Sequence, residues 1–340
     1  MAPSSRLDAF QRRHPVVGFP LAVAYKFFDD QGTYLAALIT YYAFLSLFPV
    51  LLLLSSLLGF FLRDDPGLQA RLISSALNQF PVVGAELGTP SGLSGNRTSV
   101  TIAFVVALYG ALGVAQAVQN AMNVVWGVPR NRRPNPILLR LRSLLLLATA
   151  GLTLLGTTVV STLAGSGVFG DGQVRTVLLA LLSIALNVGV LLLTLRLATA
   201  LPLSVREVLL GAVLGGVAWW ALQKLGTQYV DSVVRGANDA NGVFAVVLGL
   251  VAWIFLLAVS LVIVVEVNVV RVRHLHPRSL LTPFTDQVDL TPGDQRAYAQ
   301  LAKAQRAKGF ERVEVVFEHD GQYATATRAA EEADPPEEPA

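Results

Sequence analysis

The chain has 340 residues, of which 53% are hydrophobic and only 14% are charged, and its mean hydropathy is +0.56. Charged residues make up about a quarter of an ordinary soluble protein, so this composition excludes a simple soluble domain and a disordered polar chain. Because the chain has no cysteine, it is not a disulfide-stabilised scaffold either. From the apolar composition, we expect an all-α integral membrane protein.

Residues 1–33 are expected to form a cytoplasmic N-terminal segment. Within this segment, residues 20–28 predict a short helix at the membrane interface, with Pro20 at its start and apolar residues around Lys26. Residues 34–272 contain long uncharged stretches, and a helix that crosses a bilayer needs about 20 mostly apolar residues. These stretches predict six transmembrane helices, at residues 35–62, 98–126, 143–170, 176–195, 208–223 and 240–265.

Lysine and arginine are unevenly distributed between the two sides of this arrangement. The segments on the side of the N-terminus carry 14 of them, and the segments on the other side carry 6. The positive-inside rule therefore places both termini in the cytoplasm. The densest group consists of Arg130, Arg132, Arg133, Arg140 and Arg142. We interpret it as an orientation signal near anionic lipid and not as a nucleic-acid site, because no aromatic platform or groove-binding motif accompanies it.

Three segments outside the spans have recognisable patterns. Apolar residues at helical spacing within residues 63–97 predict an external interfacial helix. Residues 273–328 predict a small cytoplasmic segment, in which Thr291-Pro292 starts a helix that runs to Lys308 and residues 312–327 form a hairpin. Residues 329–340 are acidic and rich in proline, and they predict a disordered tail.

Four amide side chains lie on one face of the second predicted span. Gln116, Gln119, Asn120 and Asn123 follow one another at offsets of 0, 3, 4 and 7 residues. Buried amides in membrane helices usually hold neighbouring helices together through hydrogen bonds. A stripe of four is also consistent with the lining of a solvated cavity that faces the cytoplasm, and the sequence leaves both interpretations open.

Two charged residues lie near the inner ends of predicted spans. Arg196 is on the fourth span and Glu266 is on the sixth, where Asn268 follows. One hypothesis pairs Arg196 with Glu266 across the same cavity. The alternative is that both are ordinary boundary charges that reach the interface, which costs little free energy at this depth.

The residues that catalysis would require are scarce. The chain has four histidines, and only His274 and His276 are close in sequence, whereas a catalytic zinc needs three or four ligands and a general base. The sequence also lacks a P-loop, a dinucleotide-binding fingerprint and a nucleophile-elbow motif. We therefore expect no enzymatic activity, no cofactor and no metal site.

A series of small, aromatic and proline residues in the first span carries a specific resemblance. The series Ala36-Ala37, Tyr41-Tyr42 and Ser46-Leu47-Phe48-Pro49 resembles the signature of the YihY/BrkB family of bacterial inner-membrane proteins, once called ribonuclease BN. Further similar positions are Asn123, Trp126-Gly127, Pro202, Arg206, Gly211-Ala212, Trp219, Tyr229, Trp253, Glu266 and Asn268. The chain departs from the family at Asn241-Gly242, where Tyr-Gly is common. The resemblance covers about residues 20–272, which is consistent with six spans, and it implies an envelope-associated protein with links to serum resistance and lipid handling. We reject ribonuclease activity, because the histidines cannot supply the metal cluster that it would need.

These observations lead to a functional hypothesis and two alternatives. The main hypothesis is a transporter or flippase-like protein for a lipid or other amphiphile, with a cytoplasm-facing polar cavity. Its candidate lining residues are Gln116, Gln119, Asn120, Asn123, Arg196, Glu266 and Asn268. The first alternative is an envelope scaffold without transport activity, and the second is an embedded enzyme, for which Glu266 is the only candidate acid. The expected partners are membrane lipids, with a homo-oligomer or an envelope protein as further possibilities and no nucleic acid.

Overall fold

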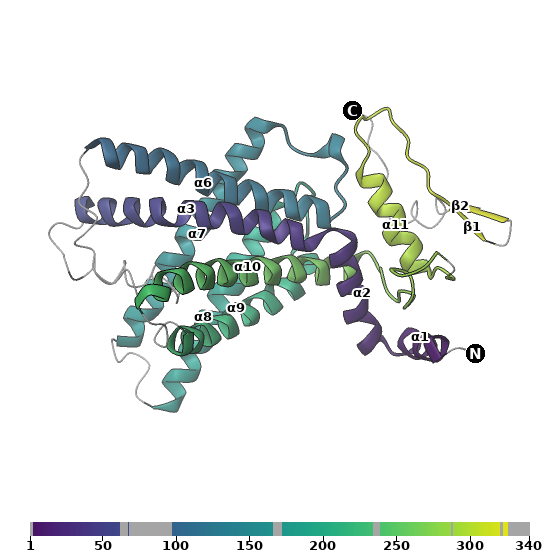
Figure 1. Cartoon of the computed structure of the whole chain (residues 1–340), viewed down its shortest axis with the longest axis horizontal. Coiled ribbons are helices and arrows are strands. Elements are labelled where there is room, and N and C mark those ends of the chain that lie inside the picture. The colour runs from purple at the N-terminus through teal and green to yellow at the C-terminus, as the bar shows by residue number, and fades with distance from the viewer. Residues whose placement is uncertain are drawn as a thin grey trace.

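The computed structural model describes residues 3–61, 67, 97–165, 172–233, 239–286, 288–319 and 322–325. Long helices dominate this part of the chain (Figure 1). In order, the elements are α1 (Pro3–Arg13), α2 (Pro15–Asp29), α3 (Gly32–Phe61), α6 (Arg97–Val125), a 3₁₀ turn (Arg130–Arg132), α7 (Pro136–Gly165), α8 (Gln173–Ala198), α9 (Val205–Val233), α10 (Asp239–Val272), α11 (Pro292–Ala304), β1 (Val316–His319) and β2 (Gln322–Thr325).

The helices α3 and α6 to α10 lie where the apolar stretches predict membrane spans. Within the described residues, the segments long and apolar enough to cross a bilayer are Phe104–Val125, Val177–Ala198, Val205–Gly226 and Val247–Val272. A shorter apolar helix covers Gly32–Leu47. These helices are those of a multi-pass membrane protein with an all-α membrane region.

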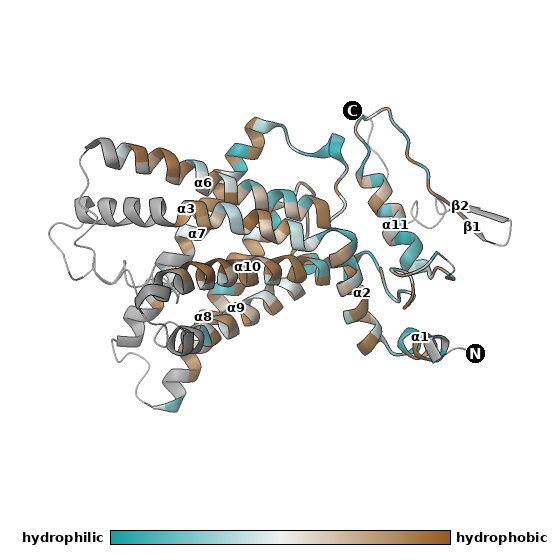
Figure 2. Cartoon of the chain, in the orientation of Figure 1, coloured by the Kyte–Doolittle hydropathy of each residue, from teal (hydrophilic) through white to brown (hydrophobic). Residues whose placement is uncertain are grey.

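The outer surfaces of the helices are apolar. Phe104, Leu144, Leu181 and Leu248 are each half or more exposed, and many other large apolar side chains are exposed as well. Figure 2 shows hydrophobic residues along the described lengths of the long helices. Exposed apolar surface of this extent marks an interaction surface, and in a protein with membrane-length helices the contacting medium is lipid.

Small residues bring α3 and α6 into close contact. A methyl group added at Gly110 of α6 would lie 2.5 Å from the Cβ atom of Ser46 on α3. One added at Gly113 would overlap the ring of Tyr42. Glycine at these two positions lets the helix backbones approach each other, as in other membrane helix pairs.

The N-terminal region differs in part from the sequence prediction. Helix α2 begins at Pro15 and contains Pro20 in its interior, so the predicted start at Pro20 is wrong. Pro15 occupies the first helical position, where a missing N–H costs nothing. An additional helix, α1, precedes α2. The chain turns at Gln31, which has a φ of 56°, and α2 then lies steeply inclined to α3 (Figure 1).

The C-terminal region contains the helix and hairpin elements at shorter lengths than predicted. Helix α11 starts after Thr291, whose side chain accepts a hydrogen bond from the backbone N–H of Asp294. It ends at Ala304, before the predicted end at Lys308. Strands β1 and β2 pair antiparallel, with Val316 opposite Thr325. The predicted external helix in residues 63–97 and the predicted disordered tail at 329–340 lie outside the described residues.

Candidate functional site

Three ionisable side chains meet where the end of α2 packs against α10. The Nζ atom of Lys26 forms an ion pair with Oδ2 of Asp30, one helical turn later in sequence. The same Nζ atom lies 3.8 Å from Oε2 of Glu266 on α10. We call Lys26, Asp30 and Glu266 the lysine cluster.

The lysine cluster is almost completely shielded from solvent. The side chains of Lys26, Asp30 and Glu266 are 4%, 3% and 0% exposed. Two carboxyl groups share one ammonium group, so the cluster carries a net negative charge when all three are ionised. Neither carboxylate oxygen of Glu266 has a hydrogen-bond partner among the described residues. A buried carboxylate without donors is costly, because no hydrogen bond from the protein compensates for its lost hydration.

Helix ends account for the position of Lys26. It lies in the last turn of α2, and Asp30 is the C-cap residue of that helix. Its Nζ atom also donates a hydrogen bond of 3.2 Å to the carbonyl oxygen of Val125, the last residue of α6. The final carbonyls of a helix lack partners within the helix and carry partial negative charge, so a cation is favoured there. Lys26 therefore ties together α2, α6 and α10.

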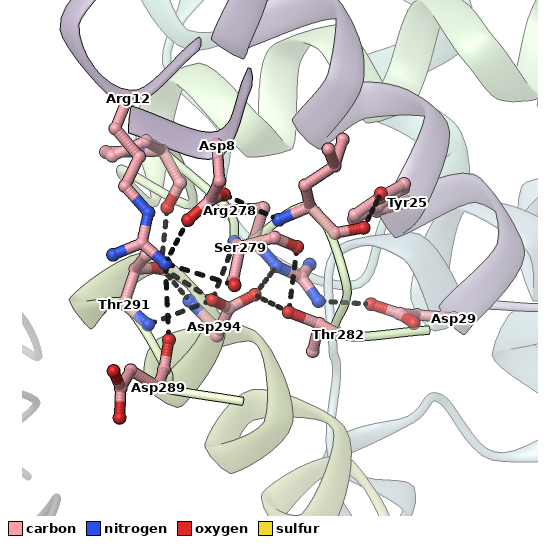
Figure 3. Close-up of polar contacts among 12 residues, drawn as sticks. Asp8, Arg12, Tyr25, Asp29, Arg278, Ser279, Thr282, Asp289, Thr291 and Asp294 are labelled. Atoms are coloured by element: carbon pink, nitrogen blue, oxygen red, sulfur yellow. Dashed lines mark hydrogen bonds and ion pairs between the residues drawn. The ribbon is translucent and has the colours of Figure 1, made fainter. Parts of the chain in front are cut away.

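A second group of buried charges begins at Asp29, the residue before Asp30, and lies outside the membrane-length helices. Figure 3 shows this second group. Arg278 follows α10 and is fully buried, and its Nε atom pairs with Oδ1 of Asp294 at the start of α11. Its Nη2 atom lies 3.0 Å from Oδ2 of Asp29 on α2. We call Arg278, Asp29 and Asp294 the arginine cluster.

The arginine cluster is rich in hydrogen-bond donors. Oδ2 of Asp294 accepts hydrogen bonds from the backbone N–H groups of Ser279 and Thr291, both at 2.9 Å, and from the Thr291 hydroxyl at 2.7 Å. The guanidinium of Arg278 also faces the ring of Tyr298 at 5.3 Å. This network fastens the segment after α10 to the start of α11.

Helix α1 adds a further contact to this region. Oδ1 of Asp8 accepts a hydrogen bond of 2.8 Å from the backbone N–H of Leu280, and Nη2 of Arg12 donates one of 3.0 Å to the hydroxyl of Ser279. On α2, the hydroxyl of Tyr25 donates a 2.6 Å hydrogen bond to the carbonyl of Leu280. Residues from the two ends of the chain therefore pack together (Figure 3).

Burial and neighbouring charges shift several pKa values here. Burial raises the pKa of Asp30 above its ordinary value, despite the attraction of Lys26. Burial lowers the pKa of Arg278, but Asp29 and Asp294 outweigh this effect and the net pKa is raised. Burial therefore makes the charged form of the Asp30 carboxyl group less favourable than it is in water, whereas Asp29 and Asp294 stabilise the charged form of the Arg278 guanidinium.

Two of the predicted amides form hydrogen bonds between segments. The side-chain nitrogen of Gln119, which is fully buried, donates to the hydroxyl of Ser143 on α7 at 2.9 Å. The side-chain oxygen of Asn123 accepts from the backbone N–H of Ala200, after α8, at 2.9 Å. Both therefore act as links between helices, which is one of the two interpretations that the sequence leaves open.

The remaining amides are placed differently. Gln116 and Asn120 on α6 are only partly buried, and Oδ1 of Asn120 lies 3.4 Å from Nη1 of Arg133. Asn268 on α10 is fully buried, and its Oδ1 accepts a hydrogen bond of 2.8 Å from the backbone N–H of Gly211. Asn268 thus connects α10 with α9.

The structure does not bring Arg196 and Glu266 together. Arg196 is exposed at the end of α8, and its Nε atom donates a 3.0 Å hydrogen bond to the carbonyl of Leu203. Glu266 is on the α10 face that meets α2, and its cationic neighbour is Lys26. Arg196 is a boundary charge, so the proposed pairing is wrong.

Among the family-signature residues whose side chains are described, most pack between helices. Ala36 is fully buried, Tyr42 lies against Gly113, and Ser46 lies against Gly110. Tyr41 and Ala37 are exposed, and the side chain of Pro49 is outside the description. Pro202 is exposed in the connection between α8 and α9, and Gly211 is the buried partner of Asn268.

Most members of both clusters are not predicted as site residues from the sequence. The pattern around Lys26 indicates only an interfacial helix, and nothing local distinguishes Asp30, Asp29 or Arg278. A single lysine in the apolar helix at residues 15–29 is the one local signal that could have identified the site. The partners of Lys26 come from a residue four positions later and from one 240 positions later, and only the folded chain joins them.

Comparison with known proteins supports the resemblance in the first span. The profile of the family described as virulence factor BrkB matches residues 23–285, which is most of the chain and includes all of α3, α6 to α10 and the lysine cluster. No curated protein and no solved structure matches the chain. From the extent of the profile match, the chain belongs to the virulence factor BrkB family.

Proposed function

We propose that the chain is a non-enzymatic transporter or flippase-like protein for a lipid or other amphiphile in the bacterial cytoplasmic membrane. The observation that carries the proposal is the lysine cluster, where three ionisable side chains are withdrawn from solvent beside a membrane-length helix. Ionisable groups at such positions are costly, and in membrane proteins they mark substrate or ion pathways. A purely structural contact could use apolar side chains of similar volume without loss of stability.

Polar side chains toward the ends of the long helices support an amphiphilic substrate. Gln116 and Asn120 remain partly exposed on α6, Arg140 is exposed near the start of α7, and Arg196 is exposed near the end of α8. Amide and guanidinium groups donate hydrogen bonds to phosphate oxygens. An anionic headgroup would find these donors beside the apolar helix surfaces that accommodate its acyl chains.

The proposal includes six transmembrane helices with both termini in the cytoplasm, and cysteine labelling tests this arrangement. The chain has no cysteine of its own, so each introduced one reports a single position. We expect Gly84→Cys to react with a membrane-impermeant maleimide in intact cells. Pro202→Cys, in the exposed connection between α8 and α9, should react only after the membrane is permeabilised. Labelling of both cysteines from the same side would contradict the arrangement.

Reconstitution tests the transport function. The purified protein is placed in liposomes with a fluorescent phosphatidylglycerol, and dithionite quenching measures the movement of this lipid between leaflets. We expect faster movement than in protein-free liposomes, and anionic lipid identified by mass spectrometry in the purified protein. Movement at the protein-free rate for phosphatidylglycerol and for every copurified lipid would contradict the proposal.

A scaffold of the cell envelope is the second candidate function. The hydrogen bonds of Gln119 to Ser143 and of Asn268 to Gly211 favour it, because they use the predicted polar positions for helix packing. A scaffold should copurify with a fixed envelope protein after mild crosslinking and should move no lipid. A transporter should move lipid as a purified single chain.

A further inference from the structure

We propose that the lysine cluster is a binding site for one proton, shared by the carboxyl groups of Asp30 and Glu266 and held beside the Lys26 ammonium. The site itself follows from the charge and burial of these three residues. Its role as the coupling ion of transport rests on the function proposed above.

The charge balance of the cluster favours an added proton. Two carboxylates and one ammonium leave one uncompensated negative charge in a place almost without solvent contact. Isolated buried charge is so costly that a group in this position changes its protonation state. One added proton makes the cluster neutral while the ion pair of Lys26 is retained.

The cluster also lacks a hydrogen-bond donor for Glu266. Both oxygens of Glu266 are buried and have no hydrogen-bond partner in the described part of the chain. Lys26 already donates to Asp30 and to the carbonyl of Val125, and its Nζ atom is 3.8 Å from Glu266, beyond hydrogen-bond distance. A proton on either carboxyl group supplies the missing donor.

The surrounding charges do not remove the imbalance. The charged groups with the strongest electrostatic interaction with the Glu266 carboxyl group are Lys26, Asp30 and Asp29, all at the end of α2. Arg278 is itself paired with Asp29, at 3.0 Å, and with Asp294, so it adds no free cation to the lysine cluster. Helix α6 faces the site with the carbonyl of Val125, and α9 meets α10 nearby through the amide of Asn268, both of which are uncharged. Lys26 is the one cation among the charges with the largest effect on Glu266, so we assign the compensating charge to a bound ion.

A proton fits the site better than a metal cation. The ammonium of Lys26 contacts Asp30 and lies between its neighbours, where a metal ion would need oxygen ligands all around it. In the described residues, no three His, Cys, Asp or Glu side chains are grouped as ligands for a metal ion. A proton needs only the two carboxyl groups.

Infrared spectroscopy of the full chain in lipid nanodiscs tests the site directly. We expect the wild type at neutral pH to show the carbonyl stretch of a protonated carboxylic acid, sensitive to deuterium exchange and lost at alkaline pH. Glu266→Gln and Asp30→Asn each leave one carboxylate beside one ammonium, so each should lack this band completely. Glu311→Gln removes a solvent-exposed carboxyl group of the C-terminal segment and should leave the band in place.

Other outcomes have definite meanings. Absence of the band in the wild type at all pH values, or its persistence in both cluster variants, would overturn the proton site. A thermal shift caused by sodium ions at constant pH, lost in Glu266→Gln, would replace the proton by a metal cation and overturn the proposal as well. The two variants are independent, so failure of one to fold leaves the other to decide. A band without lipid movement in liposomes would contradict transport and leave the proton site intact.

Discussion

The two buried charge clusters lie side by side at the end of α2, yet they differ in how their charges are satisfied. In the arginine cluster, Asp294 is paired with Arg278 and also accepts hydrogen bonds from two backbone N–H groups and a threonine hydroxyl. In the lysine cluster, the side-chain neighbours of Glu266 are a lysine at 3.8 Å and the carboxyl group of Asp30, and no N–H group among the described residues donates to it. Burial is therefore common to both clusters, and the supply of hydrogen-bond donors is the feature that separates them.

This difference follows from the positions of the clusters. The arginine cluster forms in a connecting segment and a helix start, where backbone N–H groups are unpaired and point toward an acceptor. The lysine cluster lies at helix C-termini and on the side of α10, where backbone N–H groups are already bonded within helices. A carboxyl group there must obtain its hydrogen from a side chain, from water or from its own protonation.

The largest effect is expected from Arg278→Ala, which breaks the arginine cluster. It leaves the side chain of Asp294 buried without its cationic partner, and loss of one partner of a buried pair costs about 3–5 kcal/mol. Thermal unfolding in detergent and limited proteolysis near residue 280 measure the loss. Arg312→Ala, at an exposed position, is the control and should change neither the unfolding temperature nor the protease pattern. An unchanged protease pattern in Arg278→Ala would show that the cluster does not fasten α11.

A smaller loss of unfolding free energy is expected from Lys26→Met, which removes the cation of the lysine cluster. Both remaining carboxyl groups can take up protons, which limits the cost to about 1.5–3 kcal/mol, the range for hydrogen bonds to charged groups. Combining Lys26→Met with Glu266→Gln should cost less than the sum of the single changes, because the second change removes a charge that the first left unpaired. Additive losses of unfolding free energy would mean that the two side chains do not interact.

The pH dependence of stability sharpens the contrast between the clusters. The pKa of Asp30 is raised in the folded state, so the folded chain binds this proton more tightly than the unfolded chain does. The corresponding stability is present at low pH and is lost as the pH rises through the raised pKa. The slope for one proton is at most about 1.4 kcal/mol per pH unit. Thermal unfolding measured at a series of pH values should show wild-type stability falling as the pH rises through the raised pKa of Asp30, and no such fall in Glu266→Gln. A rise in stability with pH would contradict the account.

The smallest effect is expected from Thr291→Ala at the start of α11. The change removes the N-cap oxygen and one donor to Asp294, and loss of an N-cap side chain costs about 1 kcal/mol. The arginine cluster retains its other donors, so the segment should remain fastened. Hydrogen exchange should accelerate in the first turn of α11 and stay unchanged in α10. Protection equal to that of the wild type in this first turn would mean that the N-cap is unimportant.

Most of the helices can be predicted from the sequence because each depends on a local property, an uninterrupted apolar run. The sequence also places Gln119 and Asn123 on one face, since the spacing of residues on a helix is fixed. Their partners, Ser143 and the backbone of Ala200, lie on other elements and cannot be found in this way. The same limit explains why the sequence suggests Arg196 as the partner of Glu266, although its cationic neighbour is a lysine 240 residues away.

The lysine cluster is expected to support transport, whereas the arginine cluster is expected to hold the fold together. Lipid movement in liposomes should be measured for Glu266→Gln and Asp294→Asn, normalised to the amount of folded protein, with Ser260→Ala on α10 as the control because its hydroxyl bonds only to its own helix. The account predicts that Glu266→Gln keeps its fold and loses transport, whereas Asp294→Asn loses thermal stability and retains transport per folded molecule. Full transport by folded Glu266→Gln would contradict it.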